Sequence, residues 1–221
     1  MSNQETWTAV DEYFYSGLFK GDGVLADVER ASEAAGLPAI SVSAAQGKLL
    51  GLLVRGVGAH RILEVGTLGG HSAIWMAKEI GRPGRLVTFE LDPRHAEVAR
   101  ANVDRAGVGD LVEIRVGPAA EGLGKLLDER PEPFDFVFID ADKASNAVYL
   151  DYAVRLGHPG TVIVVDNVVR GGRVLSAPDE ASVGVRELVD VLAERADVDA
   201  VAIQTVGSRG YDGFILAVVT G

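Results

Sequence analysis

The sequence predicts a single α/β domain of 221 residues, built on a mainly parallel sheet with helices on both faces. Short apolar runs alternate along the chain with amphipathic helical stretches, which is the pattern of repeated β-α-β units. Hydrophobic residues make up 48% of the chain and charged residues 24%, as in an ordinary globular protein. The length is sufficient for one substantial core, and neither a linker nor an internal repeat divides it.

Residues 1–57 are expected to form a helical cap, and residues 58–221 a Rossmann-like core. The clearest helix of the cap follows Ile40, where Ser43 and Gln46 have the spacing of a capping box and Gly58 can end the helix. In the core, strands are expected at residues 61–65, 86–90, 111–116, 134–140 and 161–166. The helices between them are expected at roughly 71–80, 94–106, 119–129 and 145–156.

The core is expected to end in an antiparallel pair of strands. A helix near 182–196 precedes strands at about 199–206 and 213–219, which are joined by the turn-rich segment Gly207–Gly213. A connection this short cannot carry a parallel crossover. The last two strands should therefore run antiparallel to each other.

The composition excludes several classes of protein. The formal net charge is −11 and no stripe of Lys or Arg is present, so nucleic acid and anionic membrane are poor candidates for partners. The chain has no cysteine, which excludes disulfides, thiolate metal sites and cysteine nucleophiles. It shows no secretory signal and no apolar run near the ~18 residues of a membrane helix, so a cytoplasmic location is expected.

Four acidic residues are predicted to lie at the carboxyl ends of the strands, where ligands bind in an open α/β sheet. Glu64 is late in the first strand, while Glu90, Asp140 and Asp166 end the second, fourth and fifth. Any one of them could simply cap the following helix. Together they would repel one another unless a cation or hydroxyl donors lie between them, so we expect a binding site at this edge.

Asp140, Asp166 and the adjacent Asn167 form a candidate metal site. Their side chains offer only oxygen ligands, which suit Mg²⁺, Mn²⁺ or Ca²⁺ rather than zinc or copper. Three protein ligands would leave coordination positions open for water or substrate oxygens. The hypothesis depends on Asp140 lying on the neighbouring strand, because an Asp-Asn pair alone is a weak signal.

A glycine-rich loop, Glu64–Gly70, connects the first strand to the helix that begins at His71 and Ser72. Glycines at such a loop let a ligand approach the backbone between strand and helix. The spacing differs from G-x-G-x-x-G, the fingerprint of NAD binding, while Glu90 lies where a ribose-binding carboxylate is expected in either case. The loop indicates an adenosine-containing ligand and disfavours NAD, with a purely structural turn as the alternative.

Taken together, these segments resemble the class I S-adenosylmethionine-dependent O-methyltransferases. The closest group is the cation-dependent branch of caffeoyl-CoA and catechol O-methyltransferases and their bacterial relatives. In order and spacing the resemblance covers roughly residues 40–220, and its most specific parts are the Asp-Ala-Asp-Lys segment and the Asp-Asn pair. The matching segments are 62–72, 88–90, 134–143, 160–168 and 211–217.

The resemblance implies a role for each residue of the predicted site. A divalent cation, with Mg²⁺ favoured, would be bound by Asp140, Asp166 and Asn167. Lys143 would stand at the position of the family's catalytic lysine, acting together with Asp140. The residues implied to bind S-adenosylmethionine are Val42, Glu64, Gly66, Thr67, Ser72, Glu90, Ala119 and Asp140. The implied sheet has seven strands in the order 3-2-1-4-5-7-6, and a homodimer is implied.

Two positions depart from the family's pattern. Pro118 stands where relatives often have a polar or acidic residue, so a contact near the adenine is in question. The segment 144–149 differs from the sequence that follows the lysine in plant-type members, which puts the details of the acceptor pocket in question. Neither departure touches the implied metal ligands.

The predicted reaction is methyl transfer to a small phenolic hydroxyl, with a catechol favoured because two adjacent hydroxyls can chelate the metal. A phenol with a pKa near ~10 is mostly protonated at neutral pH, and a bound cation would lower that pKa. Lys143 would act as general base or stabilise the phenolate; the alternative is a surface ion pair with Asp142. The rival functions are an NAD(P)-dependent oxidoreductase and a catalytically silent S-adenosylmethionine-binding protein.

Some segments have no role assigned by sequence. Trp7 and the aromatic residues 13–15 are expected to pack on the core or on a second subunit, with a lid over the acceptor pocket as the alternative. The loop 167–179 is long enough to shape substrate choice. No catalytic or zinc role is expected for the histidines, which are His60, His71, His95 and His158.

Overall fold

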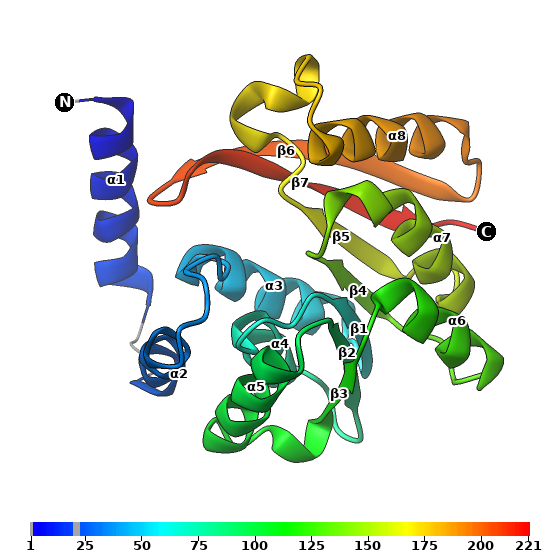
Figure 1. Ribbon diagram of the computed structural model, residues 1–221, viewed down its shortest axis with the longest axis horizontal. Helices are drawn as coiled ribbons and strands as arrows, with labels where there is room; N and C mark the ends of the chain where they lie inside the picture. The colour runs from blue at the N-terminus through cyan, green and yellow to red at the C-terminus, as the bar shows by residue number, and fades with distance from the viewer. Residues whose placement is uncertain (1, 20–22) are drawn as a thin grey trace.

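A mixed sheet forms the centre of the structure, a computed structural model that describes residues 2–19 and 23–221. Its strands are β1 (Arg61–Val65), β2 (Arg85–Glu90), β3 (Val112–Val116), β4 (Phe136–Ile139), β5 (Val162–Asp166), β6 (Val198–Gly207) and β7 (Gly210–Val219). They lie in the order β3-β2-β1-β4-β5-β7-β6 (Figure 1). The first five strands are parallel, whereas β7 is antiparallel to both β5 and β6. The predicted order and the antiparallel ending are confirmed.

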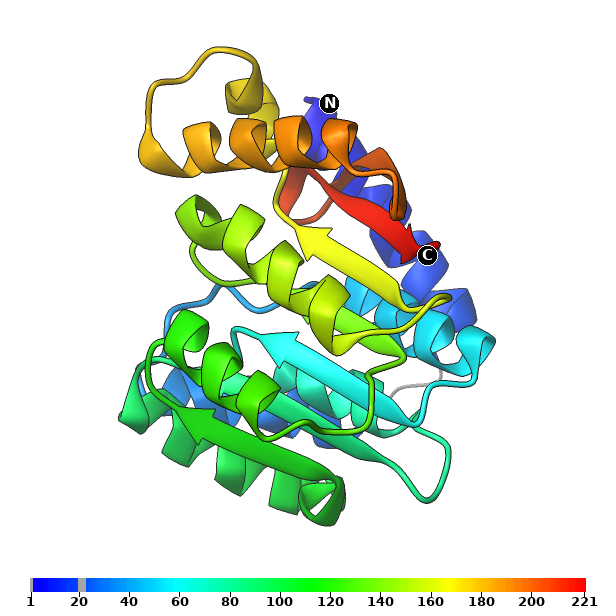
Figure 2. The same ribbon diagram turned by 90° about the vertical axis from the view of Figure 1, so that its right-hand side faces the viewer.

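Helices cover both faces of this sheet (Figure 2). One face carries α3 (Ala44–Val57), α4 (His71–Ala77) and α5 (Pro93–Arg105); the other carries α6 (Ala119–Asp128), α7 (Asn146–Leu156) and α8 (Glu180–Glu194). Successive side chains of a strand point to opposite faces. In β4, Phe136 and Phe138 therefore pack in one core, and Val137 and Ile139 in the other.

The N-terminal helices are α1 (Asn3–Leu18) and α2 (Gly23–Ala34), while residues 1 and 20–22 of the predicted cap lie outside the described residues. No residue of α1 is buried. Instead α1 contacts the β6–β7 hairpin, because Asp11 Oδ2 accepts a hydrogen bond of 2.7 Å from the Ser208 amide. Tyr13 and Phe14 are 73% and 52% exposed. Packing of these two rings on the core is excluded, and an interface or a lid remains.

Two connections differ from the sequence prediction. The last hairpin has only Ser208 and Arg209 between its strands, because β6 and β7 pair along their whole length up to Gly207 and Gly210. The loop after β5 contains a short 3₁₀ helix, η3 (Arg170–Leu175). Two further 3₁₀ turns are η1 (Gly109–Leu111) and η2 (Lys143–Ser145).

Within residues 2–19 and 23–221, no helix is both long and apolar enough to span a membrane.

Candidate active site

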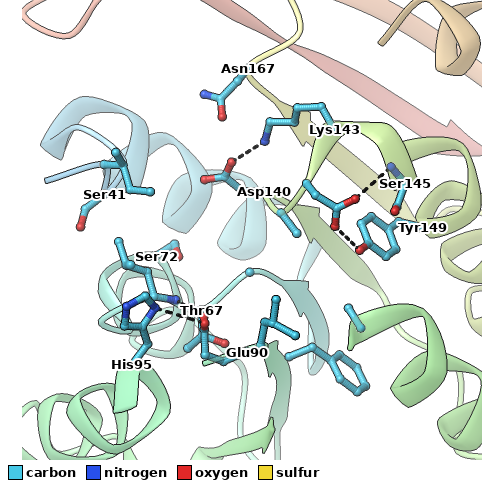
Figure 3. Close-up of a pocket in the computed structure, with 18 of the residues that line it drawn as sticks. Ser41, Thr67, Ser72, Glu90, His95, Asp140, Lys143, Ser145, Tyr149 and Asn167 are labelled. Carbon is cyan, nitrogen blue, oxygen red and sulfur yellow. Dashed lines mark hydrogen bonds and ion pairs between the residues drawn. The ribbon is translucent and has the colours of Figure 1, made fainter. Parts of the chain in front are cut away.

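A cavity of about 670 Å³ opens at the carboxyl ends of the parallel strands (Figure 3). Its walls come from the loops that follow β1, β2, β3 and β4, and the segment from Pro38 to Val42 adds a further wall. The predicted site residues that line it are Val42, Gly66, Thr67, Ser72, Glu90, Ala119, Asp140, Lys143 and Asn167. Nine of the eleven predicted residues thus meet at one cavity, and the other two, Glu64 and Asp166, lie behind its wall.

The loop after β1 passes very close to the end of β4. A Cβ atom at Gly66 would lie 2.3 Å from the carbonyl oxygen of Asp140, and the φ angle of Gly66 is 102°. Both the space and the backbone conformation therefore require glycine. This close approach fixes the loop backbone beside Asp140, where it forms part of the cavity wall.

Glu64 is fully buried behind this wall. The Ser72 hydroxyl donates to one of its carboxylate oxygens and the Thr88 hydroxyl to the other, both at 2.6 Å, while Thr67 and Thr88 share a hydrogen bond of 2.6 Å. Burial raises the pKa of Glu64 to about 8, although these hydrogen bonds oppose the rise. A ligand in the cavity would reach Glu64 through the Ser72 hydroxyl rather than directly.

Glu90 lies at the end of β2 with its carboxylate on the cavity wall. The Leu68 amide donates to one oxygen at 2.7 Å and the Asp92 amide to the other at 3.0 Å. His95 Nδ1 lies 3.3 Å from Glu90, and its side chain is only 23% exposed. His95 therefore lines the cavity beside Glu90 and is not a solvated position of the helix. His95 stands in the first turn of α5, which begins after Asp92 caps it, and that turn faces back toward the end of β2.

Lys143 contacts Asp140, with Nζ 2.8 Å from Oδ1 (Figure 3). Its side chain is only 8% exposed. The alternative of a surface ion pair with Asp142 is wrong, because Asp142 caps η2 and accepts hydrogen bonds from the Tyr149 hydroxyl and the Ser145 amide instead. Burial alone would raise the pKa of Asp142, but these hydrogen bonds outweigh it and lower that pKa. The Lys143 side chain is thus directed at Asp140, which directly follows β4.

Tyr149 is a cavity-lining residue that sequence reasoning did not identify. Its hydroxyl donates to Asp142 at 2.5 Å. Burial and this hydrogen bond raise the pKa of Tyr149 to about 12. Tyr149 therefore stays protonated at neutral pH and acts as a hydrogen-bond donor, so it is no candidate for a general base.

Asp140 and Asp166 come together because β4 and β5 are parallel neighbours with Ile139 opposite Val165. Asp166 is 3% exposed. Burial, and then the negative charge of Asp140, raise the pKa of Asp166 to about 7. Asn167, the next residue, has its side chain on the same cavity (Figure 3).

This donor set fits a hard cation. Among residues 2–19 and 23–221, no group of three or more His, Cys, Asp or Glu side chains could hold a metal ion, so the candidate set is two carboxylates and one amide. All three donors are oxygen atoms, as Mg²⁺ and Ca²⁺ prefer. The buried carboxylate of Asp166 is repelled by the partly exposed carboxylate of Asp140, and a positive charge between them would relieve this repulsion.

Gln46 is a second residue that the sequence did not assign to the site. Ser43 caps α3 by accepting a hydrogen bond from the Gln46 amide, as predicted. The Gln46 side chain, however, does not complete the capping box: its Nε2 donates to Asp166 Oδ2 at 2.5 Å. A residue of α3 thus holds the side chain of the candidate metal ligand Asp166 in place.

A second cavity of about 280 Å³ lies on the other side of the Asp-Asn pair. Gln46, Asp166 and the β6–β7 hairpin line it, and Asn167 lines both cavities. The candidate metal ligands therefore stand between a large cavity and a small one. This arrangement suits two reactants that meet at the partition.

Comparison with known proteins reveals close relatives. The sequence model described as O-methyltransferase matches residues 20–218. A catechol O-methyltransferase of Mycobacterium tuberculosis is 51% identical over 220 residues, which is 99% of each chain. The solved structure of an O-methyltransferase from Bacillus cereus in complex with SAH has a TM-score of 0.96 and 49% identity, covering 98% of this chain and 100% of that chain. The solved structure of an O-methyltransferase from Streptomyces achromogenes in complex with SAM also has a TM-score of 0.96 and 49% identity, and the match covers 100% of both chains.

Proposed function

The chain belongs to the O-methyltransferase family, and on that basis we propose that it transfers a methyl group from S-adenosylmethionine to a hydroxyl of a small catechol-type phenol beside a divalent cation. The observation that carries this proposal is that Asn167 lines both a cavity of about 670 Å³ and one of about 280 Å³, with Asp140 and Lys143 on the larger cavity and Asp166 on the smaller. The larger cavity would hold the methyl donor. The smaller has room for a single-ring acceptor.

The methyl donor would be held by residues along the wall of the larger cavity. S-adenosylmethionine supplies an activated methyl group on a sulfonium sulfur, and the reaction needs a deprotonated acceptor oxygen aligned with it. The carboxylate of Glu90 has lone pairs left beyond its two backbone partners, and these can accept from the ribose hydroxyls. Ser72 donates its proton to Glu64, so its oxygen can accept from the ammonium group of the methionine part.

The cation would be held by Asp140, Asp166 and Asn167. Coordination to a divalent cation lowers the pKa of a hydroxyl group and fixes its oxygen in place. Lys143 Nζ donates to Asp140 in the structure, so its amino group lies beside the proposed cation, where it would stabilise the phenolate or act as general base. Catechols are favoured because two adjacent oxygens can occupy the coordination positions that three protein ligands leave open.

A homodimer is part of this proposal. Apolar side chains are exposed on α1, among them Tyr13, Phe14 and Leu18, and on the edge strand β6, among them Val201 and Ile203. An exposed edge strand with apolar side chains is a common site of association. Sedimentation at several protein concentrations distinguishes a dimer from a monomer.

The experiment is methyl transfer from labelled S-adenosylmethionine to catechols and to phenols with a single hydroxyl, with Mg²⁺ or with EDTA. Catechol methylation that EDTA abolishes is the expected result. Transfer that survives EDTA would contradict the metal part of the proposal alone. A protein that binds the methyl donor in calorimetry but methylates no phenol of a broad panel would instead be a silent binding protein.

A further inference from the structure

The carboxylate of Asp212, in β7, accepts two backbone hydrogen bonds from the loop that follows β5. Its Oδ1 atom accepts from the amides of Val169 at 3.0 Å and Arg170 at 2.8 Å. The same oxygen accepts from the amide of Gly213 at 2.9 Å. One side-chain oxygen thus joins β7 to the first residues beyond the candidate metal ligands Asp166 and Asn167.

The neighbouring glycine brings this loop close to the sheet. The Val168 amide donates to the carbonyl oxygen of Gly213 at 3.0 Å. A Cβ atom at Gly213 would lie 2.7 Å from the Val169 side chain and 2.3 Å from the Ile203 carbonyl oxygen. The loop therefore packs directly on the backbone of β7, at the position from which Asp212 reaches its amides.

The loop also has an unusual backbone conformation. Asn167 and Arg170 have φ angles of 57° and 58°, in the left-handed region that residues other than glycine rarely adopt. Such conformations persist only where the surrounding structure holds them. The hydrogen bonds from Val169 and Arg170 to Asp212 lie within this segment, and the direction of the Asn167 side chain depends on its backbone.

From these contacts we infer that Asp212 is a positioning residue for the metal site: by holding the loop backbone, it keeps Asn167 aimed at the place between Asp140 and Asp166. The inference rests on the proposed function, since that proposal supplies the metal. Asp212 acts through the loop and not as a ligand. Partners outside the ligand set of a metal site affect metal binding because they orient the ligands.

The test measures binding of Mn²⁺, by calorimetry, to the full chain and to two variants. Asp212→Ala removes the acceptor and is expected to weaken Mn²⁺ binding by about 10–100-fold. Asp212→Asn keeps a side-chain oxygen that can accept the same amide protons, and is expected to restore most of the affinity. Binding of SAH, measured separately, should remain unchanged in both variants because Asp212 lines the smaller cavity and not the larger one, where the methyl donor would bind.

Asp135 provides a matched control. Its Oδ2 atom also accepts two backbone hydrogen bonds, from His60 and Arg61, both at 2.8 Å, but it directly precedes β4 and so lies at the amino ends of the parallel strands, away from the candidate metal site. Asp135→Ala should lower the thermal stability and leave Mn²⁺ binding unchanged. A loss of Mn²⁺ binding in this control would show that general destabilisation explains the Asp212 result, and would overturn the inference.

The remaining outcomes separate the inference from the proposed function. Wild-type affinity for Mn²⁺ in Asp212→Ala would overturn the inference alone. An Asp212→Asn variant that binds as weakly as Asp212→Ala would show that the negative charge matters instead of the backbone contacts, and would also overturn it. A wild-type chain that binds no Mn²⁺ would overturn both the metal part of the proposed function and this inference.

Discussion

The raised pKa of the buried Glu64 carboxyl group is expected to make the stability of the protein depend on pH. Glu64 has no exposed surface, and its partners are the hydroxyls of Ser72 and Thr88. Burial raises its pKa from 4.5 to about 8. At neutral pH the side chain is therefore mainly protonated in the folded protein and ionised in the unfolded chain.

The sign of the effect follows from this difference. The pKa of Glu64 is higher in the folded protein than in the unfolded chain. Its stabilising contribution to the free energy of unfolding is therefore complete below about pH 4.5 and is lost as the pH rises to about 8. The difference between the two pKa values corresponds to about 5 kcal/mol. That is a large share of the roughly 5–15 kcal/mol by which a domain is stable.

The Glu64→Gln variant keeps the shape of the side chain and removes its titration. We expect the free energy of unfolding of the wild type to fall, relative to that of the variant, between about pH 5 and about pH 8. Urea unfolding at a series of pH values measures this difference. Glu97→Gln, which removes an exposed glutamate on α5, controls for the loss of a carboxylate. Parallel pH profiles for the wild type and Glu64→Gln would show instead that the pKa of Glu64 does not change on folding.

Three further predictions concern catalysis, the metal site and the core. Lys143→Met removes the amino group beside Asp140 and should lower kcat by about 10²-fold or more, while SAH binding is kept. An unchanged single-turnover rate would show that Lys143 takes no part in the mechanism. Gln46→Ala removes the hydrogen bond to Asp166 and should raise the Mg²⁺ concentration for half-maximal rate by about 10-fold; no change would show that Asp166 needs no support from α3. Leu150→Ala removes a fully buried side chain and should cost ~2–5 kcal/mol in urea unfolding; a much smaller loss would mean that the core closes around the cavity.

Much of the fold could be predicted from the sequence because alternating apolar runs and amphipathic helices determine which segments become strands. The same pattern placed Asp140 and Asp166 at the ends of neighbouring strands, and the sheet order confirms that they are neighbours. The resemblance to the O-methyltransferase family is confirmed as well. These predictions depend on local patterns and on the order of segments, both of which the sequence contains.

The contacts that were missed join segments far apart in the chain. Gln46 has the spacing of a capping residue, and nothing local indicates that its side chain reaches Asp166, 120 positions later. Asp212 likewise acts on Arg170, 42 positions earlier. His95 is the exception, because its place in the first turn after a capping Asp92 could have indicated that it faces the strand end. Side-chain partners of this kind follow only from the packing of the elements.

In the proposed function, Asp166 and its neighbours Asp140 and Asn167 would hold the cation that activates the acceptor hydroxyl. The most direct test is a Mg²⁺ titration of the initial rate of catechol methylation, in the wild type and in Asp166→Asn, with S-adenosylmethionine saturating. We expect the variant to need a much higher Mg²⁺ concentration for half-maximal rate while its affinity for SAH is unchanged. An identical dependence on Mg²⁺ in the two proteins, or a rate that does not depend on Mg²⁺ in either, would contradict this expectation.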